Sequence, residues 1–136
     1  FVFLSIAMLF SILISAADDL LGRHDKHSLP QQALMEIVIS QLSANNQTVF
    51  QDLDGEFLDI TEWTNVFFND SAEIHIITWC ELFQLEEKPS GQGTILLEWL
   101  PDTVTEFRID GRGFHGVFDA GLLPKLLQRI DISDCR

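Results

Sequence analysis

The sequence GTILLEWLPDTVTEFRIDGRGFHGVFDAGLLPKLLQRIDISDCR, residues 93–136, carries one pattern twice. The repeated marks are, in order, Gly93 and Gly116, Leu100-Pro101 and Leu123-Pro124, and Ile109 and Ile132. The two members of every pair are the same number of residues apart (116 − 93 = 132 − 109 = 23), and we call this interval the repeat step. A fixed step of this length predicts structural units laid side by side, so this stretch decides the fold.

Each copy contains a short segment in which apolar and polar residues alternate, as they do in a strand with one buried face. Phe107 and Ile109 are the apolar positions of the first copy. Ile130 and Ile132 take their places in the second. We therefore predict two short strands whose apolar side chains point into one core, where these four residues have structural roles.

The second copy, from Leu127 to Cys135, fits the form L-x-x-L-x-L-x-x-N/C, and this form resembles the leucine-rich repeat family. The resemblance implies an α/β repeat, a leucine-rich repeat solenoid with parallel strands on its concave face. Cys135 stands at the ninth position, where a Cys or Asn can hydrogen-bond the turn backbone. Arg112 holds that place in the first copy. The leading Leu-Pro of each copy is similar to the surface repeat proteins of kinetoplastid protozoa.

The resemblance also implies a set of solvent-facing residues on the concave face: Glu106, Arg108, Asp110, Arg129, Asp131 and Ser133. The repeat step places Glu106 beside Arg129. It likewise places Arg108 beside Asp131. Opposite charges on neighbouring strands favour that register, by about 0.2–1 kcal/mol for each exposed pair. These six residues are the predicted binding surface for a protein or glycan ligand.

The N-terminal half predicts a helix over residues 31–42, with a helical N-terminal cap to the repeats. Its apolar stripe, at helical spacing, consists of Ala33, Leu34, Ile37, Val38 and Leu42. Downstream, Trp63-Thr-Asn-Val66 leads into a predicted hairpin. A helix, a loop and such a hairpin resemble the N-terminal caps of plant leucine-rich repeat receptors. Phe68 stands where that cap has a cysteine, so packing by Trp63, Phe67 or Phe68 is expected to close this end.

The strand of the first, irregular repeat is expected at Ile74-x-Ile76. The two isoleucines take the apolar places of the repeat pattern, so both are expected to point inward. His75, between them, falls at a position that should face water.

The chain begins with 17 uncharged residues, FVFLSIAMLFSILISAA, followed by two aspartates. Small residues at Ser15 and Ala17 favour a secretory signal peptide cleaved after Ala17, and an uncleaved membrane anchor is the alternative. Both interpretations predict a secreted or cell-surface protein. The acceptor pattern N-x-S/T then predicts a glycoprotein, with glycosylation at Asn46 and Asn69.

The predicted domain organisation is a partial signal peptide at 1–17, a linker at 18–29, a cap and first irregular repeat with an insertion at 30–92, and two leucine-rich repeats at 93–136, the second truncated. A solenoid usually needs three or more repeats and a closing cap. We therefore expect a fragment of a longer protein. The exposed edge of the last strand also predicts self-association.

The formal net charge of the chain is −13 at pH 7. Nucleic acid and anionic membranes repel such a chain, so neither is an expected partner, and no membrane insertion is expected beyond an uncleaved anchor. Two cysteines, Cys80 and Cys135, are too few for a disulfide-rich scaffold. They could pair in an oxidising compartment, although the repeat pattern leads us to expect a reduced Cys135.

A competing interpretation is a nucleotide-binding βαβ unit around Gly111–Gly116. The segment Gly111-Arg-Gly113-Phe-His-Gly116 has the form G-x-G-x-x-G, and Asp131 follows at the spacing of the acidic residue in dinucleotide-binding folds. That motif should open a helix at once, whereas Gly121 and Pro124 interrupt the residues that follow. The repeat step also accounts for Gly116, as the counterpart of Gly93, without any phosphate.

The remaining polar clusters do not complete a catalytic or metal site. His24-Asp-Lys-His27 lacks further ligands, so we expect a solvated linker there. Asp52-Leu-Asp54-Gly-Glu56 lacks the later ligands of a calcium loop, so a turn is predicted. His75 and His115 have no adjacent catalytic groups in the sequence. We expect neither enzyme activity nor a metal or cofactor.

The predicted function is recognition, by a secreted or cell-surface protein whose concave face binds another protein or a glycan. The alternatives are a nucleotide-binding unit and a truncated product without function.

Overall fold

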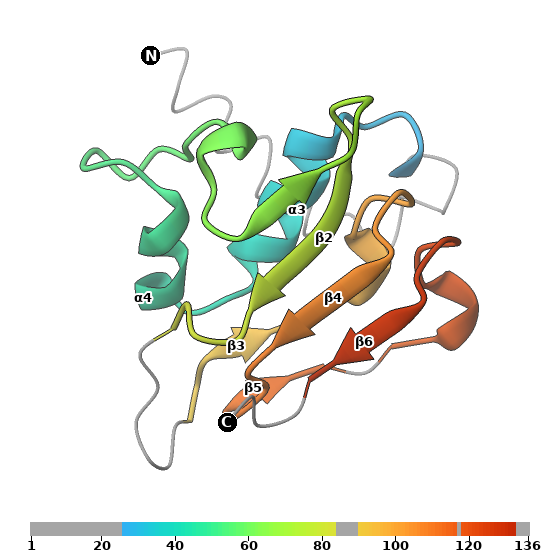
Figure 1. Ribbon diagram of the computed structural model, residues 1–136. Helices are drawn as coiled ribbons and strands as arrows, with labels where there is room; N and C mark the ends of the chain where they lie inside the picture. Colours follow the sequence, from blue (N-terminus) through green and yellow to red (C-terminus); the bar gives the residue numbers. More distant parts are fainter. Residues whose placement is uncertain (1–25, 84–89, 117, 133–136) are drawn as a thin grey trace.

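A four-stranded sheet organises the fold, in the order β1-β2-β4-β6 (Figure 1). The structure is a computed structural model and describes residues 26–83, 90–116 and 118–132. The strands of this sheet are β1 (Val66–Phe68), β2 (Ile74–Trp79), β4 (Glu106–Ile109) and β6 (Arg129–Asp131). β1 runs antiparallel to β2, whereas β2, β4 and β6 run parallel to one another.

The strands of the two sequence copies pair at the repeat step. Glu106 is the register partner of Arg129, and Phe107 is the partner of Ile130. The same step relates two single-turn 3-10 helices, η3 (Leu97–Trp99) and η4 (Ala120–Leu122). A second sheet has two parallel strands, β3 (Gly93–Thr94) and β5 (Phe114–His115). The two copies therefore lie side by side, as their spacing predicts.

The predicted leucine-rich repeat solenoid is wrong. The protein is a small mixed α/β fold with a four-stranded, mostly parallel sheet and two short helices among the described residues. An antiparallel strand, β1, forms one edge of the sheet, and helix α3 lies behind it, so the elements enclose one core (Figure 1). The repeat step fixes which strands are neighbours, but it does not fix how many units follow or what covers them. The open side of the sheet is thus not the inner wall of a repeat array.

Helix α3 (Gln31–Ser40) supplies one wall of the core, as its sequence pattern predicts. All five residues of the predicted stripe are buried, and Leu42, just beyond the helix, is 4% exposed. Gln31 and Gln32 attach the start of the helix to the rest of the fold. Gln31 Oε1 accepts a hydrogen bond from Ile74 N, and Gln32 Oε1 accepts one from Ile60 N. α3 is therefore fixed to the sheet at its polar end and along its apolar stripe.

Aromatic residues fill the centre of the core. The ring of Phe50 lies 4.8 Å from that of Trp63 and 5.1 Å from that of Trp79, and Trp79 meets Phe107 edge-on at 5.7 Å. Phe50 follows the short helix α4 (Ala44–Gln47) in the 3-10 turn η1 (Thr48–Phe50). Trp63, expected to close this end, is 4% exposed and does so. A second 3-10 turn, η2 (Ile60–Glu62), leads into it.

Two glycines allow close approaches of the backbone that the fold needs. Gly93 has φ of +111°, and a Cβ there would lie 2.5 Å from Leu42 Cα. A Cβ on Gly111 would collide with the backbone of Ile132. Gly93 thus lets β3 reach the end of α3, and Gly111 lets the chain leaving β4 pass against the chain leaving β6.

Cys80, the residue after β2, is disulfide-bonded. The sequence has one other cysteine, Cys135, which lies outside the described residues. The expectation of a reduced, ladder-type Cys135 thus concerns a residue outside the described part of the chain. The predicted signal peptide at 1–17 also lies outside the described residues. Within the described segments, no helix has the length and apolar character of a membrane span.

Candidate functional site

The side of the main sheet that faces away from α3 is the candidate site. Figure 1 shows α3 behind β2, and none of the described helices lies in front of β2, β4 and β6. We define the open face as two rows of side chains that run across the strands. The first row is Phe67, Ile76, Glu106 and Arg129, and the second row is Thr78, Arg108 and Asp131.

Alternation along the strands produces this face. In β4, Glu106 and Arg108 are half-buried, whereas Phe107 between them is fully buried on the core side. In β6, Arg129 is exposed and Ile130 packs against the core. Polar and apolar positions therefore separate to opposite sides of the sheet, as the sequence pattern predicts.

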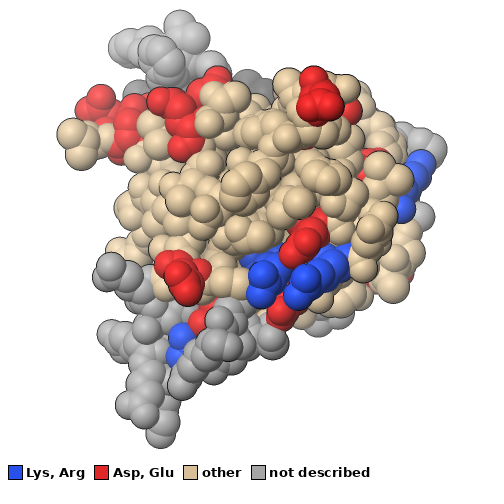
Figure 2. Space-filling model, in the orientation of Figure 1, with Lys and Arg blue, Asp and Glu red and all other residues tan. Residues whose placement is uncertain are grey.

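The charged half of the open face is ordered by pairs between neighbouring strands. Arg129 Nη1 lies 3.7 Å from Glu106 Oε1, and Arg108 Nε lies 3.8 Å from Asp131 Oδ2. The repeat step predicts both pairs of opposite charge, and both are confirmed. Figure 2 shows the basic atoms grouped over β4 and β6, with acidic atoms on two sides of them. The arrangement is a two-by-two square in which the sign of the charge alternates in both directions.

The other half of the open face has no charged side chain and consists of Phe67, Ile76 and Thr78. Phe67, on the edge strand β1, is 50% exposed, and its register partner Ile76 is half-buried. The corresponding part of the surface in Figure 2 carries no charged atoms over β1 and β2. A phenyl ring with half of its surface in water gains only part of the free energy that full burial would supply. Packing against a partner would remove that ring from water.

The sequence analysis missed this uncharged half because β2 does not alternate regularly. Ile74 and Ile77 are both buried although they are three positions apart, and the register shifts between Phe67 and Phe68. The irregular pairing turns Ile76 outward, whereas regular alternation from Ile74 would place it inward. Phe67 faces solvent and Phe68 packs against the core. The sequence predicted that Trp63, Phe67 or Phe68 closes this end, but it did not predict which of the two phenylalanines is buried. The shift becomes visible only when the strands are paired.

Asp110 does not belong to the open face, where the sequence placed it. β4 ends at Ile109, so the alternation stops one residue earlier, and Asp110 is 5% exposed. Its carboxylate accepts hydrogen bonds from Arg112 Nη2 at 2.8 Å and from Arg112 Nε at 3.0 and 3.1 Å. The pair holds the turn after β4 and has a structural role. Ser133, the sixth predicted binding residue, lies outside the described residues.

The predicted structural residues lie in or against the core. Phe107 and Ile109 are buried, at 0% and 1% exposed. Ile130 and Ile132 are partly buried and pack against the same core. All four side chains therefore contribute to the interior and not to the open face.

The two predicted glycosylation sites differ in accessibility. Asn69 is exposed in the β1–β2 hairpin, where its Oδ1 accepts hydrogen bonds from the backbone N–H groups of Ser71 and Glu73. Asn46 is 7% exposed, and its Nδ2 donates to Gln92 O and Gln92 Oε1. Nδ2 is the atom that would carry a glycan. Asn69 Nδ2 also donates a hydrogen bond, to Glu73 Oε1, but at the surface, so the folded chain presents Asn69 and not Asn46.

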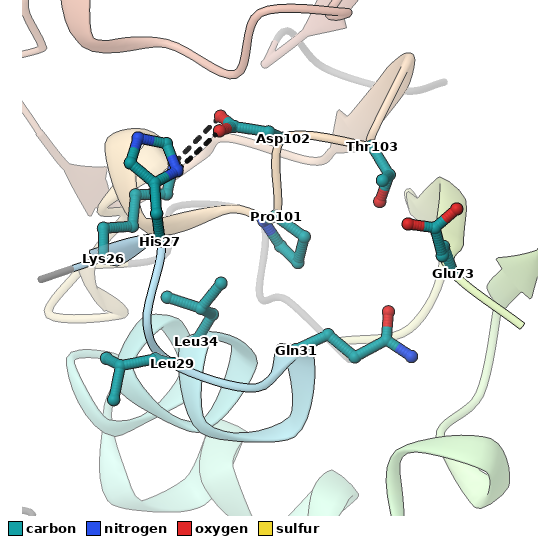
Figure 3. A pocket seen from close by; sticks show the side chains of 9 residues that line it. All are labelled: Lys26, His27, Leu29, Gln31, Leu34, Glu73, Pro101, Asp102 and Thr103. Atoms are coloured by element: carbon teal, nitrogen blue, oxygen red, sulfur yellow. Dashed lines mark hydrogen bonds and ion pairs between the residues drawn. The ribbon is translucent and has the colours of Figure 1, made fainter. Parts of the chain in front are cut away.

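A cavity of about 240 Å³ lies between the start of α3, the β1–β2 hairpin and the segment before β4 (Figure 3). Its lining consists of Lys26, His27, Leu29, Gln31, Leu34, Glu73, Pro101, Asp102 and Thr103. His27 and Lys26 fall in the predicted solvated linker, yet both reach Asp102. His27 Nδ1 lies 3.1 Å from Asp102 Oδ2, and Lys26 Nζ lies 3.5 Å from Asp102 Oδ1.

The polar groups of this cavity hold the chain together. Gln31 Nε2 donates to Ala72 O, and Thr103 Oγ1 donates to Ile74 O. Burial lowers the pKa of Lys26 below its ordinary value of 10.5, although the carboxylates of Asp102 and Glu98 oppose the change. These side chains join three segments of the fold.

The competing nucleotide interpretation lacks its helix. The element that follows Gly116 among the described residues is the single turn η4 (Ala120–Leu122), so no helix N-terminus faces the glycine-rich segment. Gly111 and Gly116 lie instead where the backbone packs too closely for a side chain. A Cβ on Gly116 would lie 3.0 Å from Ile95 O, in the neighbouring copy of the pattern. The glycines serve close approach between the two copies, and no phosphate is needed to account for them.

The segment from Asp52 to Glu56 is the predicted turn. Asp52 Oδ1 accepts hydrogen bonds from the backbone N–H groups of Asp54 and Glu56, and Gly55 has φ of +83°. Among the residues that the structure describes, no three His, Cys, Asp or Glu side chains gather as a metal site would require.

Comparison of the chain with protein-family models, with curated proteins and with solved structures finds no significant match.

Proposed function

We propose that this is a secreted or cell-surface recognition protein that binds a partner protein through the open face. The observation that carries the proposal is the composition of that face. It places an exposed aromatic ring and an aliphatic side chain next to an ordered group of charges that includes two arginines. Aromatic residues and arginine are enriched in protein interfaces and at the positions that dominate their binding energy.

The extent of the site across four strands favours a protein over a small ligand or a glycan. The open face is a sheet surface, and the cavity described above is lined by polar groups that bond to the chain itself. A partner protein can cover the rows of side chains across β1, β2, β4 and β6 at once. Phe67 would then be the apolar anchor, and the charge pairs would fix the orientation of the partner.

Two observations support an extracellular location. Cys80 is disulfide-bonded, and disulfides persist in oxidising compartments. Asn69, in an N-x-S/T pattern, is exposed in the β1–β2 hairpin. Together with the uncharged N-terminal segment, both features fit a chain that passes through the secretory pathway.

A binding screen with matched variants tests the proposal. The wild-type chain, presented as a multivalent probe, is screened against a panel of extracellular proteins, itself included, and each partner is measured again with Phe67→Ser and Arg129→Ser. Both variants are expected to weaken binding by about tenfold or more, which corresponds to about 1.4 kcal/mol. Leu53→Ser is the control, because Leu53 is fully exposed in the turn after Asp52, away from the open face.

Binding that is unchanged in both open-face variants would contradict the proposed site. Circular dichroism and the thermal midpoint of each variant confirm that a loss of binding is not a loss of fold.

A further inference from the structure

The charges on the open face form a self-complementary pattern. The first row carries Glu106 and Arg129, from β4 and β6, and the second row carries Arg108 and Asp131 from the same two strands. Each negative group therefore has positive groups as its neighbours, both across the strands and along them. The face as a whole is neutral, since these four charges cancel, although the chain has a net charge of −13.

We infer that the partner of the open face is a second copy of this chain, docked face to face about a two-fold axis that lies in the face and crosses the strands. This inference rests on the proposed function and names the partner of the same site. Such an axis keeps β4 opposite β4 and β6 opposite β6, and it exchanges the two rows. Glu106 then faces Arg108 of the second copy, and Arg129 faces its Asp131.

Like charges do not meet in this arrangement. If the first row carried the same signs as the second, the rotation would bring arginine onto arginine. With alternating signs, no arginine faces an arginine of the second copy when the two-fold axis crosses the strands. The same holds when the axis runs parallel to the strands. The pairs that fix the strand register within one chain, at 3.7 and 3.8 Å, therefore also prepare a surface that accepts its own copy.

The uncharged half of the face supports the same geometry. Ile76 lies in the first row and Thr78 in the second, so the row exchange places Ile76 over Thr78 of the other copy. Phe67, 50% exposed, lies at the end of the first row and covers the margin of the contact. Removing the exposed part of this ring from water favours association.

Electrostatic repulsion between two copies is not increased locally at this face, because the charges of its two arginines and two carboxylates cancel. Two chains with a net charge of −13 repel each other, and a face with a surplus of carboxylates would add to the repulsion. The open face presents two arginines against two carboxylates. A second copy can approach there without a local excess of like charge.

The test exchanges the two charges of one row and keeps a pair of opposite charges between positions 106 and 129. In the variant E106R/R129E the pair across β4 and β6 has reversed signs, and the composition and net charge are unchanged. The two-fold rotation now brings position 106 onto Arg108 with the same charge, and position 129 onto Asp131 with the same charge. Sedimentation equilibrium of the full chain is expected to show a wild-type dimer and at least about tenfold weaker association of this variant.

A second variant restores complementarity. Reversal of all four charges, in E106R/R108E/R129E/D131R, recreates the alternating square with opposite signs. This variant is expected to associate with itself as the wild type does. The variant is then mixed with labelled wild-type chain. In a mixed dimer, position 106 of one copy faces position 108 of the other, and the two side chains carry the same charge. The dissociation constant of mixed dimers is therefore expected to be at least about tenfold higher.

Two results would overturn the inference. One is a wild-type chain that stays monomeric up to millimolar concentration, and the other is a row-exchange variant that dimerises as tightly as wild type. In either case the binding screen separates the two proposals. If another protein binds wild type and loses binding in Phe67→Ser, the proposed function stands with a different partner. If no binding depends on Phe67 or Arg129, both proposals fail.

Discussion

Glu106 and Arg129 lie side by side on neighbouring parallel strands, with Arg129 Nη1 3.7 Å from Glu106 Oε1. Their separation along the chain is the repeat step, the same interval that relates the two copies of the sequence pattern. The contact therefore places corresponding strands of the two copies, β4 and β6, side by side. It also forms half of the charged square on the open face.

The first prediction concerns the strength of this contact. In a double-mutant cycle of Glu106→Ala and Arg129→Ala, the coupling free energy is expected to be about 0.2–0.5 kcal/mol, at the low end for surface pairs because the Arg129 side chain is 58% exposed. Urea denaturation of the wild type, both single variants and the double variant measures it. A parallel cycle of Glu106→Ala with Lys125→Ala, an exposed lysine that has no described contact with Glu106, should be additive. Equal coupling in both cycles would refute a specific pair.

The second prediction compares two phenylalanines with opposite environments. Phe50 is 0% exposed and contacts Trp63 and Trp79, so Phe50→Ala is expected to lower the free energy of unfolding by about 3–5 kcal/mol. Phe67 is 50% exposed, so Phe67→Ala is expected to change it by about 0.5 kcal/mol or less. Urea denaturation at a concentration where wild type is monomeric measures both values. A loss of similar size in the two variants would mean that the core assignment is incorrect.

The third prediction is a pH dependence that arises at Glu36. Burial raises the pKa of Glu36 above its ordinary value of 4.5; the hydrogen bond from Gln32 opposes the rise and the nearby Glu56 adds to it. The folded chain therefore holds the proton more tightly than the unfolded chain does. Below pH 4.5 the carboxyl group is protonated in both states, and burial of its charge costs nothing. Above the raised pKa of the folded chain the group is charged, and its burial lowers the free energy of unfolding. The free energy of unfolding therefore falls as the pH rises from the unfolded pKa to the folded pKa.

Glu36→Gln removes that cost. The variant is expected to be more stable than wild type at pH 7, by about 0.5 kcal/mol after allowance for solvent screening of a half-buried group, and equally stable near pH 4. Thermal unfolding at a series of pH values measures the difference. Glu62→Gln, at an exposed position in η2, is the control for the loss of one carboxylate. A gain in stability for Glu36→Gln that is the same at pH 4 and pH 7 would exclude titration as its cause.

The fourth prediction concerns glycosylation in a secretory host. Asn69 is exposed and Asn46 is 7% exposed with its amide nitrogen bonded to Gln92, so a glycan is expected on Asn69. Asn69→Gln should abolish the mobility shift on treatment with an N-glycosidase, and Asn46→Gln should retain it. Intact-mass measurement of the secreted chain identifies the site directly. A secreted chain without glycan would argue against the extracellular proposal.

Several features of the fold could be predicted from the sequence because they depend on local periodicity. The apolar stripe from Ala33 to Leu42 predicts helix α3 and its buried side. The repeat step predicts the pairing of Glu106 with Arg129. Each of these patterns lies within one element, or relates two elements by a constant offset. They therefore required no knowledge of the rest of the chain.

Other features depended on contacts between segments with no shared pattern. The sequence places Asp110 on the strand face, but the strand ends at Ile109, and Arg112 draws the carboxylate into the turn. Asn46 matches a glycosylation pattern, but Gln92, far along the chain, binds its amide. The repeat pattern places Ile76 inward, and the irregular pairing of β1 with β2 turns it outward. Each change arises from a partner that periodicity cannot identify.

The sequence by itself determined which residues of the last two strands are neighbours and which of their side chains are apolar, because both follow from a constant spacing along the chain. Tertiary structure alone decided that these strands join an antiparallel hairpin and a helix around one aromatic core. It also decided that Phe67 and Ile76 complete the open face. The reason is physical: side chains such as Phe50, Trp63 and Trp79 bury their surface against whichever segments reach them. That choice depends on the shape of the whole core and not on any one segment.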